Sequence, residues 1–336
     1  MGVPISIADA ADLVDLSIQD VFVKEGKTQK KRVYPKYFNE ITGITDYYTK
    51  DSSFTGLGLA GRIIENASVV AESPVQGFDK TYTQVEWGKV FTVTKLLWKF
   101  GIQKRKIESL AKSAINACER KRETLCADRV DNAFSTSYTV QDDAGNFTMT
   151  ISGGNSVALC SASQTREDGG TNNNNRITDG TTVNMDIDYD AIKALHRTAS
   201  LVLDGKGNKM DIMPDRLLFA RGVAGAFRAK EILGAVKTGG ARSLPSSAQN
   251  DAAGIPEFEV VEIPWITTNT GYWAATDSSL INDMYGLQIK EAQPIQNEGP
   301  NVVFRTGELQ FKSTLMFDLG HNDYRGFFES KNTNAS

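Results

Sequence analysis

The sequence predicts an α+β fold, on three observations. Helical and strand periodicities are mixed along the 336 residues without the regular alternation of a doubly wound sheet. The stretch Tyr82–Thr94 alternates like a strand and is followed closely by one very long helical stripe. Extended runs return after Phe258 and continue toward the C-terminus. At roughly 150 residues per domain, this length predicts about two domains or subdomains.

Composition limits the classes of function before any motif is considered. The chain has 37 basic and 41 acidic residues, a formal charge of −4, which gives no overall attraction to nucleic acid or to an anionic membrane. With only His196 and His321 as histidines and three cysteines, neither an all-protein zinc site nor a disulfide scaffold is expected. No apolar run reaches the ~18 residues of a membrane span, and no secretory signal opens the sequence. We therefore expect an intracellular protein without cofactor, metal or membrane partner.

Residues 1–50 are expected to form an N-terminal arm. Within them, Ile7–Phe22 places apolar residues at spacings of three and four, which predicts a short amphipathic helix. The basic stretch Lys24–Lys36 follows, and we expect it to be a solvated or partner-seeking segment.

Residues 51–100 are expected to form an extended loop. Two β-type runs, Ile63–Glu72 and Tyr82–Thr94, flank a turn at Ser73, Pro74 and Gly77. A hairpin of this length is not stable alone in water, so it must pack on other parts of the chain or on another molecule.

A glycine-rich segment at the start of this loop has two interpretations. Gly56, Gly58 and Gly61 have the G-x-G-x-x-G spacing with which backbone amides approach a pyrophosphate at a helix start. The preceding segment Tyr47–Phe54 is polar, however, and Pro74 interrupts the segment that follows. We therefore favour a flexible hinge at these three glycines, with a nucleotide-binding enzyme as the alternative function.

Residues 102–135 give the strongest helical pattern of the chain. Apolar residues recur on one face without an intervening glycine or proline, which predicts a helix about 50 Å long. Cys118 and Cys126 belong to this stripe, so both are expected to be core thiols. The segment Lys89–Arg122 also contains ten basic residues against two acidic ones, the largest local charge imbalance in the sequence.

From Tyr138 onward, short helices and strands are mixed. The spacing predicts short strands and loops over 138–179, a helix over 190–203, a turn at 204–208, a strand over 217–220 and a helix over 223–236. A Gly/Ser/Ala-rich loop over 238–254 precedes further strands, and a last alternating run covers Val302–Phe317.

The sequence shows no arrangement of catalytic side chains. An alternating run resembles a set of calcium ligands: Asn184, Asp186, Asp188 and Asp190. Tyr189 stands where an EF-hand loop requires glycine, so helix capping is the favoured role of this run. Neither histidine lies beside a nucleophile signature. We therefore expect no enzymatic activity.

The order of elements and three short segments carry a resemblance to a known family. The segments are Ala158–Ser161, Lys209–Phe219 and Asp323–Phe328. Together with an N-terminal arm, a long β excursion and one long basic helix, they resemble the major capsid protein of tailed double-stranded-DNA bacteriophages, which has the Hong Kong 97 type of shell fold.

The resemblance implies a domain plan. After the arm (1–50) and the extended loop (51–100), residues 101–185 would form a peripheral domain whose spine helix spans 102–135. Residues 186–292 would form the axial domain, and residues 293–336 would return to the peripheral domain.

It also implies a function in self-assembly. Copies of the chain would form hexamers and pentamers of an icosahedral shell around packaged double-stranded DNA, bound without sequence specificity. The shell would be assembled in the host bacterial cytoplasm with a portal and a separate scaffolding or decoration protein, and would become part of the virion. A shell of the same fold with a different cargo is the second alternative.

The resemblance assigns roles to individual residues. Contacts between subunits would come from the extended loop: Val75, Phe78, Lys80, Tyr82 and Trp87. A closing strand motif would consist of Asp323, Tyr324, Arg325 and Gly326. Some relatives join subunits by a Lys–Asn isopeptide bond, but no asparagine partner for Lys80 is identifiable, so we expect no such bond. Deletion of residues 75–83 is expected to block assembly and to spare folding.

Overall fold

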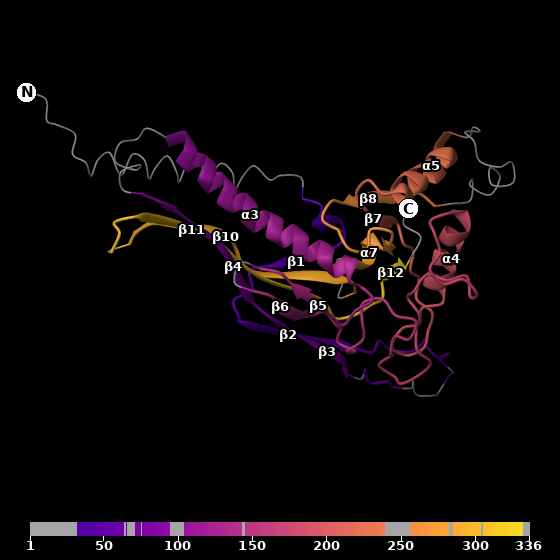
Figure 1. Cartoon of the computed structure of the whole chain (residues 1–336). Coiled ribbons are helices and arrows are strands. Elements are labelled where there is room, and N and C mark those ends of the chain that lie inside the picture. The colour runs from indigo at the N-terminus through magenta and orange to yellow at the C-terminus, as the bar shows by residue number, and fades with distance from the viewer. Residues whose placement is uncertain are drawn as a thin grey trace, which may run out of the picture.

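Two four-stranded sheets organise the chain, which confirms the α+β class (Figure 1). The computed structural model describes residues 32–63, 65, 71–74, 76–94, 104–142, 145–238, 256–281, 285–303 and 305–331. The helix expected over Ile7–Phe22 and the loop expected over 238–254 lie outside these residues, apart from Thr238 at the end of a helix.

A long sheet forms the elongated half of the molecule. Its strand order is β1-β10-β11-β4, with β1 at Asn39–Thr42, β10 at Leu287–Val302, β11 at Leu309–His321 and β4 at Val85–Val93. The β10–β11 hairpin is antiparallel, β4 pairs antiparallel with β11, and β1 pairs parallel with β10. The alternating run expected over Val302–Phe317 is therefore divided, because β10 ends at Val302 and the turn before β11 follows it.

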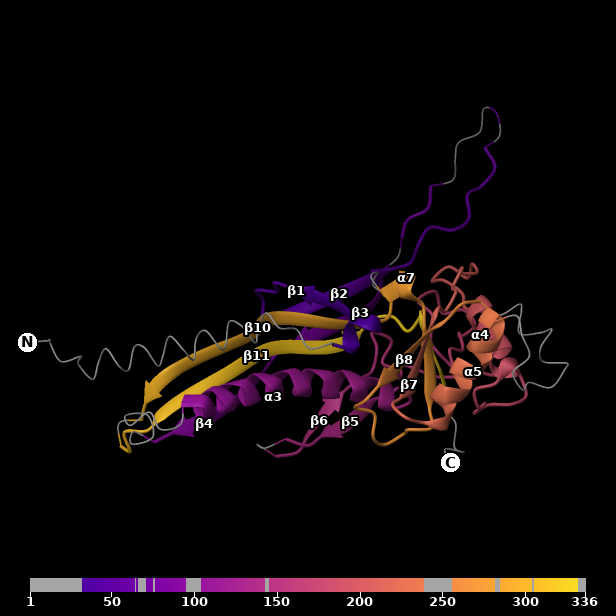
Figure 2. The same ribbon diagram turned by 90° about the horizontal axis from the view of Figure 1, so that it is seen from above.

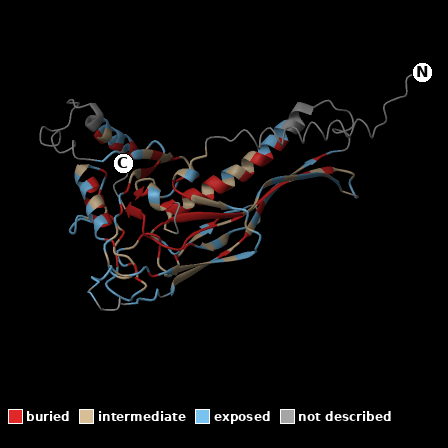
Figure 3. Ribbon diagram, turned by 180° about the vertical axis from the view of Figure 1, so that it is seen from behind, coloured by how far each residue is buried: buried red, intermediate tan, exposed pale blue. Residues whose placement is uncertain are grey.

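Helix α3 (Lys104–Asp131) lies along one face of this sheet (Figures 1 and 2). Its 28 residues correspond to about 42 Å at 1.5 Å per residue, which confirms the predicted long helix. The buried residues of its stripe include Ala111, Ala114, Ile115, Cys118, Leu125, Cys126 and Val130. Figure 3 shows this face in red against the sheet. Leu110 is 42% exposed, so among the described side chains of α3 the buried stripe begins at Ala111.

A two-stranded sheet covers part of the opposite face. It consists of β2 (Tyr48–Phe54) and β3 (Gln76–Thr83), paired antiparallel. The side chain of Tyr82 contacts residues of β10 and β11 that alternate with the core positions: its hydroxyl donates to Gln288 Oε1 at 3.5 Å, and its ring lies 4.3 Å from Lys290 Nζ. The two faces of the long sheet are thus packed by α3 and by β2–β3.

This pairing corrects the hairpin expected from the sequence. The described residues of 63–72 form no strand, and β3 pairs with β2 instead. The continuous run Tyr82–Thr94 is divided at Gln84, where the chain passes from β3 into β4 of the long sheet. The Thr83 amide donates to Asp318 Oδ2 at 2.8 Å and the Gln84 amide donates to the Tyr47 carbonyl at 3.1 Å, which fixes this crossing. Alternation continues through the crossing, so the pattern alone does not reveal it.

Strand β10 extends well beyond its short neighbour β1. The pairing with β1 covers only residues 288–291, and among the described strands no other pairs with this edge of β10. The remaining part of β10 contains Pro294 and Pro300, which have no backbone N–H, and its pairing with β11 has three register shifts.

The second four-stranded sheet and the helices that pack on it form the other end of the molecule, which we call the short-sheet unit. Its strand order is β12-β9-β7-β8, with β12 at Phe327–Ser330, β9 at Trp273–Thr276, β7 at Arg216–Ala220 and β8 at Glu259–Ile263. Helices α4 (Tyr189–Ser200) and α5 (Ala224–Thr238) pack on it around a core that includes Leu195, Phe219, Ile232 and Trp273. These elements confirm the predicted helices at 190–203 and 223–236 and the predicted strand at 217–220.

The remaining elements are short. They are η1 (Tyr34–Lys36), the hairpin strands β5 (Ser137–Val140) and β6 (Phe147–Thr150), and α7 (Ser278–Ile281). Asp188 caps α4 by accepting a hydrogen bond from the Ala191 amide at 2.7 Å, which confirms the predicted capping role. The predicted turn at 204–208 is also present: Asp204 Oδ1 accepts from the amides of Lys206 and Asn208, each at 2.8 Å.

Candidate interaction surface

Between β2 and β3 the described residues 55–63, 65 and 71–74 form a projection that we call the finger (Figure 2). Its described residues and the adjoining β2 segment expose large apolar side chains: Tyr47, Tyr48, Phe54, Leu57, Leu59 and Ile63. Leu59 is 85% exposed. A concentration of exposed apolar surface on a projecting segment is typical of a site that contacts another protein.

Glu72 holds the two sides of the finger to each other and to the body. Its Oε2 accepts a hydrogen bond from the Gly58 amide at 2.8 Å, and its Oε1 lies 2.8 Å from Lys206 Nζ in the short-sheet unit. The Lys206 ammonium and the Gly58 amide lower the pKa of the Glu72 carboxyl, which therefore stays ionised at neutral pH. Close by, Thr55 is buried, and a Cβ at Gly205 would lie only 3.2 Å from its methyl carbon.

The described residues of the glycine-rich segment do not show the arrangement of a nucleotide site. No helix begins at residues 62, 63 and 65, the described residues directly after Gly61. The Gly58 amide, which such a site would use, is bound by the Glu72 carboxylate. None of the three glycines has a positive φ, and the hinge assigned to Gly56, Gly58 and Gly61 stays a prediction.

The residues assigned to subunit contacts have different environments. Val75 lies outside the described residues, and Phe78 is half-buried in β3. Tyr82 is fully buried and Trp87 is 7% exposed, the latter packed in the main core beneath Lys121, whose Nζ is 4.5 Å from the ring centroid. These two side chains stabilise the subunit itself, which corrects their assignment. The surface available to a neighbour lies earlier in the chain, in the finger.

Lys80 lies within a strand, not at a loop tip, and belongs to a buried cationic cluster. Its Nζ donates to the Ser152 carbonyl at 2.7 Å. Arg129 of α3 donates from Nη2 to His321 Nδ1 at 3.3 Å, so the proton of the neutral imidazole is on Nε2. Asp318 is the carboxylate that faces these cations.

Burial changes the titration of this cluster. Burial, together with the charge of Arg129, lowers the pKa of Lys80 to about 8, and burial lowers the pKa of Arg129 to about 10. Burial, together with the charges of Arg129 and Lys80, holds the pKa of His321 well below its ordinary value. The imidazole is therefore neutral at pH 7, and adding a proton would place a third positive charge in the cluster.

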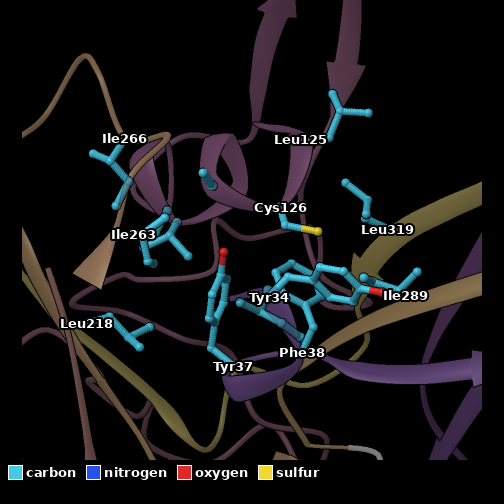
Figure 4. Packing of buried hydrophobic residues seen from close by; sticks show 14 of the residues in the cluster. Tyr34, Tyr37, Phe38, Leu125, Cys126, Leu218, Ile263, Ile266, Ile289 and Leu319 are labelled. Atoms are coloured by element: carbon cyan, nitrogen blue, oxygen red, sulfur yellow. The ribbon is translucent and has the colours of Figure 1, made fainter. Parts of the chain in front are cut away.

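The segment that begins at Arg32 packs onto α3 and the long sheet. Tyr34, Tyr37 and Phe38 are buried beneath α3 beside Cys126 (Figure 4). Arg122 of α3 is 2% exposed; its Nη1 donates to the Tyr34 hydroxyl at 3.1 Å and lies 3.1 Å from the Glu40 carboxylate and 3.2 Å from that of Glu291.

This packing also involves the described end of the basic stretch. Arg32 pairs with Glu119 at 2.7 Å, and Lys36 pairs with Glu259. Both charges pair within the subunit; Arg32 is partly buried, whereas the Lys36 side chain stays exposed, as expected of a solvated segment. The lysines at 24, 27, 30 and 31 lie outside the described residues.

The predicted closing motif is a buried ion-pair cluster followed by a strand. Arg325 forms two hydrogen bonds to the Glu167 carboxylate, at 2.8 and 3.1 Å, and pairs with Asp323. Its Nε donates to the Leu203 carbonyl at 3.0 Å. Gly326 has a φ of 103°, a conformation that glycine adopts without strain, and β12 begins at the next residue. Arg325 therefore joins three loops that are far apart in the sequence.

The described residues provide no second type of site. All three cysteines are buried free thiols, as expected for Cys118 and Cys126. In the described part of the chain, no group of histidine, cysteine and carboxylate side chains is arranged to hold a metal ion. No helix in that part is both long and apolar enough to cross a membrane.

Sequence reasoning missed the apolar residues of the finger and the role of Glu72. A signal for the former was present, because Leu57 and Leu59 stand among glycines where no core-forming periodicity explains them. The contact of Glu72 with Lys206 had no local signal, since the two residues meet only in the folded chain.

Comparison with known proteins gives the following similarities. A family model described as phage capsid protein matches residues 78–330. No curated protein matches the sequence. The capsid structure of cyanophage P-SCSP1u has a TM-score of 0.50 and 9% identity over 91% of this chain and 89% of that chain; this likeness concerns the fold. The capsid of Myoviridae phage XM1 has a TM-score of 0.49 and 11% identity over 87% of this chain and 89% of that chain.

Proposed function

Because the chain belongs to the phage capsid protein family, we propose that it is the repeating subunit of the icosahedral shell that encloses the genome in a tailed-phage head. The finger supports this proposal independently of the family match, because it projects from the body of its own subunit and exposes apolar side chains. Such a subunit acts through contact with copies of itself, and its role is structural.

The proposed domain plan follows the two sheets. The long sheet and α3 would form the peripheral domain with its spine helix, and the short-sheet unit would form the axial domain at the centre of hexamers and pentamers. The finger, within the predicted extended loop 51–100, would lie on a neighbouring subunit. The segment near Arg32 would join the N-terminal arm to the body.

Contact with a neighbour would remove the apolar side chains of the finger from water. Full burial of a leucine-sized side chain contributes about 1.5–3 kcal/mol. A few such side chains per finger, repeated around a closed ring, give favourable association without a large net charge on the subunit.

The proposed partners are those expected from the family resemblance. They are copies of this chain, a portal, a separate scaffolding or decoration protein, and double-stranded DNA held without sequence specificity. The shell would be assembled in the cytoplasm of the host bacterium and would remain in the virion. The family description favours a phage genome over another cargo, and the nucleic-acid content of purified particles tests this choice.

The finger is tested by the double variant Leu57→Asp/Leu59→Asp. Both side chains are exposed in the subunit, so we expect an unchanged circular dichroism spectrum and unfolding midpoint. When the variant is expressed with the other head proteins of its phage, we expect no closed shells by electron microscopy. The matched control is Leu57→Met/Leu59→Met, which keeps the apolar surface and is expected to form shells. Normal shells from the aspartate variant would contradict the role of the finger.

A further inference from the structure

The short-sheet unit has an open groove beside the N-terminal end of α5. The groove has a volume of about 900 Å³, and its lining includes Phe219, Val223, Phe227 and Trp273. Phe219 and Trp273 are stacked with ring centroids 6.4 Å apart, and the indole N–H is already bound to the Met185 carbonyl at 2.9 Å. Both rings form the floor of the groove and are only 1% and 2% exposed, so the apolar surface that the groove offers comes from Phe227 and the half-buried Val223.

The rim of this groove combines an exposed aromatic ring with charges. Phe227 is 57% exposed. The next residue of α5, Arg228, forms an exposed pair at 3.5 Å with Glu231, which lies about one turn further along the helix. A solvent-exposed ion pair of this kind is weak, so each of its two charges can pair with another residue at little cost in free energy.

A second exposed surface lies at the far end of α4, and we call residues 201–213 the α4 end. It exposes two large apolar side chains, Leu201 and Met213, each close to 60% exposed (57% and 58%). Lys209 and Asp211, which are also exposed, stand between them. The segment is held in place where the Met210 amide donates to the Val202 carbonyl at 3.2 Å.

The groove and the α4 end lie on opposite sides of the unit. Ile187, which lines the groove, immediately precedes Asp188, the residue that caps α4, whereas Leu201 follows its last residue. At 1.5 Å per residue, the 12 residues of α4 separate the two by about 18 Å. The α4 end is on the side of the finger, since Lys206 pairs with Glu72, and α5 lies on the side away from the finger (Figure 2).

We propose that the groove of one copy receives the α4 end of the next copy around each ring of subunits. This inference rests on the proposed shell function and names the surfaces through which neighbouring axial domains meet. A closed ring requires two different faces on each subunit that fit each other head to tail, and the unit has such a pair on opposite sides.

The chemistry of the two surfaces is complementary. Leu201 and Met213 supply apolar side chains for a groove rimmed by Phe227. The ammonium of Lys209 is matched by the carboxylate of Glu231, and the carboxylate of Asp211 is matched by the guanidinium of Arg228. These charges alone do not set the direction of docking, since each surface has one cation and one anion; the closed ring requires the head-to-tail direction.

The apolar part of the contact is tested by Phe227→Glu and by Met213→Glu. Each replaces an exposed side chain, so both variants should fold as the parent protein does, judged by circular dichroism and unfolding midpoint. The yield of rings and shells should fall at least about tenfold, the loss that follows removal of a central contact residue. The controls Phe227→Leu and Met213→Leu should assemble normally.

Mixing the two variants tests the direction of docking. A Met213→Glu copy keeps an unaltered groove and a Phe227→Glu copy keeps an unaltered α4 end. These two surfaces can therefore form one contact between the two variants. We expect mixed dimers in sedimentation velocity, although neither variant dimerises alone and no shells form. A groove that instead binds a scaffolding protein would give no mixed dimer, and this result would overturn the inference.

A charge exchange tests the polar part. Lys209→Glu alone places two carboxylates opposite each other and should reduce ring yield, and Lys209→Glu combined with Glu231→Lys should restore it. Absence of rescue, or normal shells from Phe227→Glu and Met213→Glu, overturns the inference and leaves the shell function intact. Absence of shells from the parent chain and its phage partners would overturn the shell function instead.

Discussion

Arg129, Lys80 and His321 show what a buried cluster of cations does to a single side chain. Arg129 and Lys80 face one carboxylate, Asp318, so the cluster has no spare negative charge for a protonated imidazole. The unfolded chain has no such restriction, and its histidines titrate near pH 6.5. Folding therefore keeps His321 neutral at pH values where the unfolded chain binds a proton.

The stability of the subunit should consequently depend on His321 below pH 6.5. The pKa of His321 is lower in the folded than in the unfolded chain, so the stability that depends on its neutral imidazole is fully present above about pH 6.5. This contribution is lost as the pH falls toward the folded pKa. The loss attributable to this residue is about 1.4 kcal/mol at pH 5.5, one unit below the unfolded pKa. Urea unfolding of the parent protein and of His321→Gln at pH 7.5 and 5.5 measures it.

The comparison isolates His321 because other titrating groups are common to both proteins. Glutamine still offers an acceptor to Arg129 but binds no proton, so the variant should lose less stability between the two pH values. Equal losses in the two proteins would show that His321 does not titrate in this manner.

Individual residues were predictable where their role is local. The cap at Asp188 and the burial of Cys118 and Cys126 follow from neighbours within a few residues along the chain. Tyr82 and Trp87 were assigned to a neighbouring subunit from the family resemblance, which alternation could not correct because it shows only which side chains share a face of a strand. It does not show whether the sheet that receives them belongs to the same chain.

At the scale of elements, α3 shows how one helix provides both a core face and an exposed face. Leu125 is 1% exposed in the main core, whereas Leu110 of the same helix is 42% exposed. Leu125→Ala should reduce the free energy of unfolding by about 2–5 kcal/mol, through lost burial and the cavity left behind.

The matched control for that prediction is Leu110→Ala, which should change the free energy of unfolding by no more than about 0.5 kcal/mol. Urea unfolding monitored by circular dichroism measures both variants. Equal effects at the two positions would contradict the orientation of α3.

Strand pairing was the part of the fold that sequence patterns could not supply. The helices of the short-sheet unit, the strand β7 and the long helix were predicted closely, because each is defined by a period along the chain. The partners of β3 and β4 are β2 and β11, which no periodicity identifies. The deletion of residues 75–83 was therefore expected to spare folding but would remove β3 and the buried Tyr82.

At the scale of the whole molecule, Arg325 joins three loops where the chain passes from β11 of the long sheet to β12 of the short-sheet unit. It binds Glu167, Asp323 and the Leu203 carbonyl, and it lies just before β12 of the short-sheet unit. Burial raises the pKa of Asp323, and the adjacent guanidinium opposes that effect, so the ions depend on each other. The sequence predicted a closing motif at this position from resemblance alone and gave no indication of its partners.

Arg325→Met should strongly destabilise the subunit, because it leaves two buried carboxylates without their cation. Removing one partner of a buried ion pair typically costs about 3–5 kcal/mol. Arg325→Lys, which keeps the charge but not the paired hydrogen bonds to Glu167, should lose less. Urea unfolding midpoints at constant pH measure the three proteins, and a methionine variant as stable as the parent would contradict the proposed connection.

The edge of β10 that no described strand pairs with beyond Glu291 has a consequence for how the subunit associates. A protein that must meet many copies of itself at high local concentration risks adding strands edge to edge without limit, which gives fibres. Pro294, Pro300 and the three register shifts make this edge a poor template for another strand. Association then depends on side-chain contact surfaces of defined shape. The angles at which subunits meet through these contacts determine the curvature of the assembly, and growth stops when the assembly closes on itself.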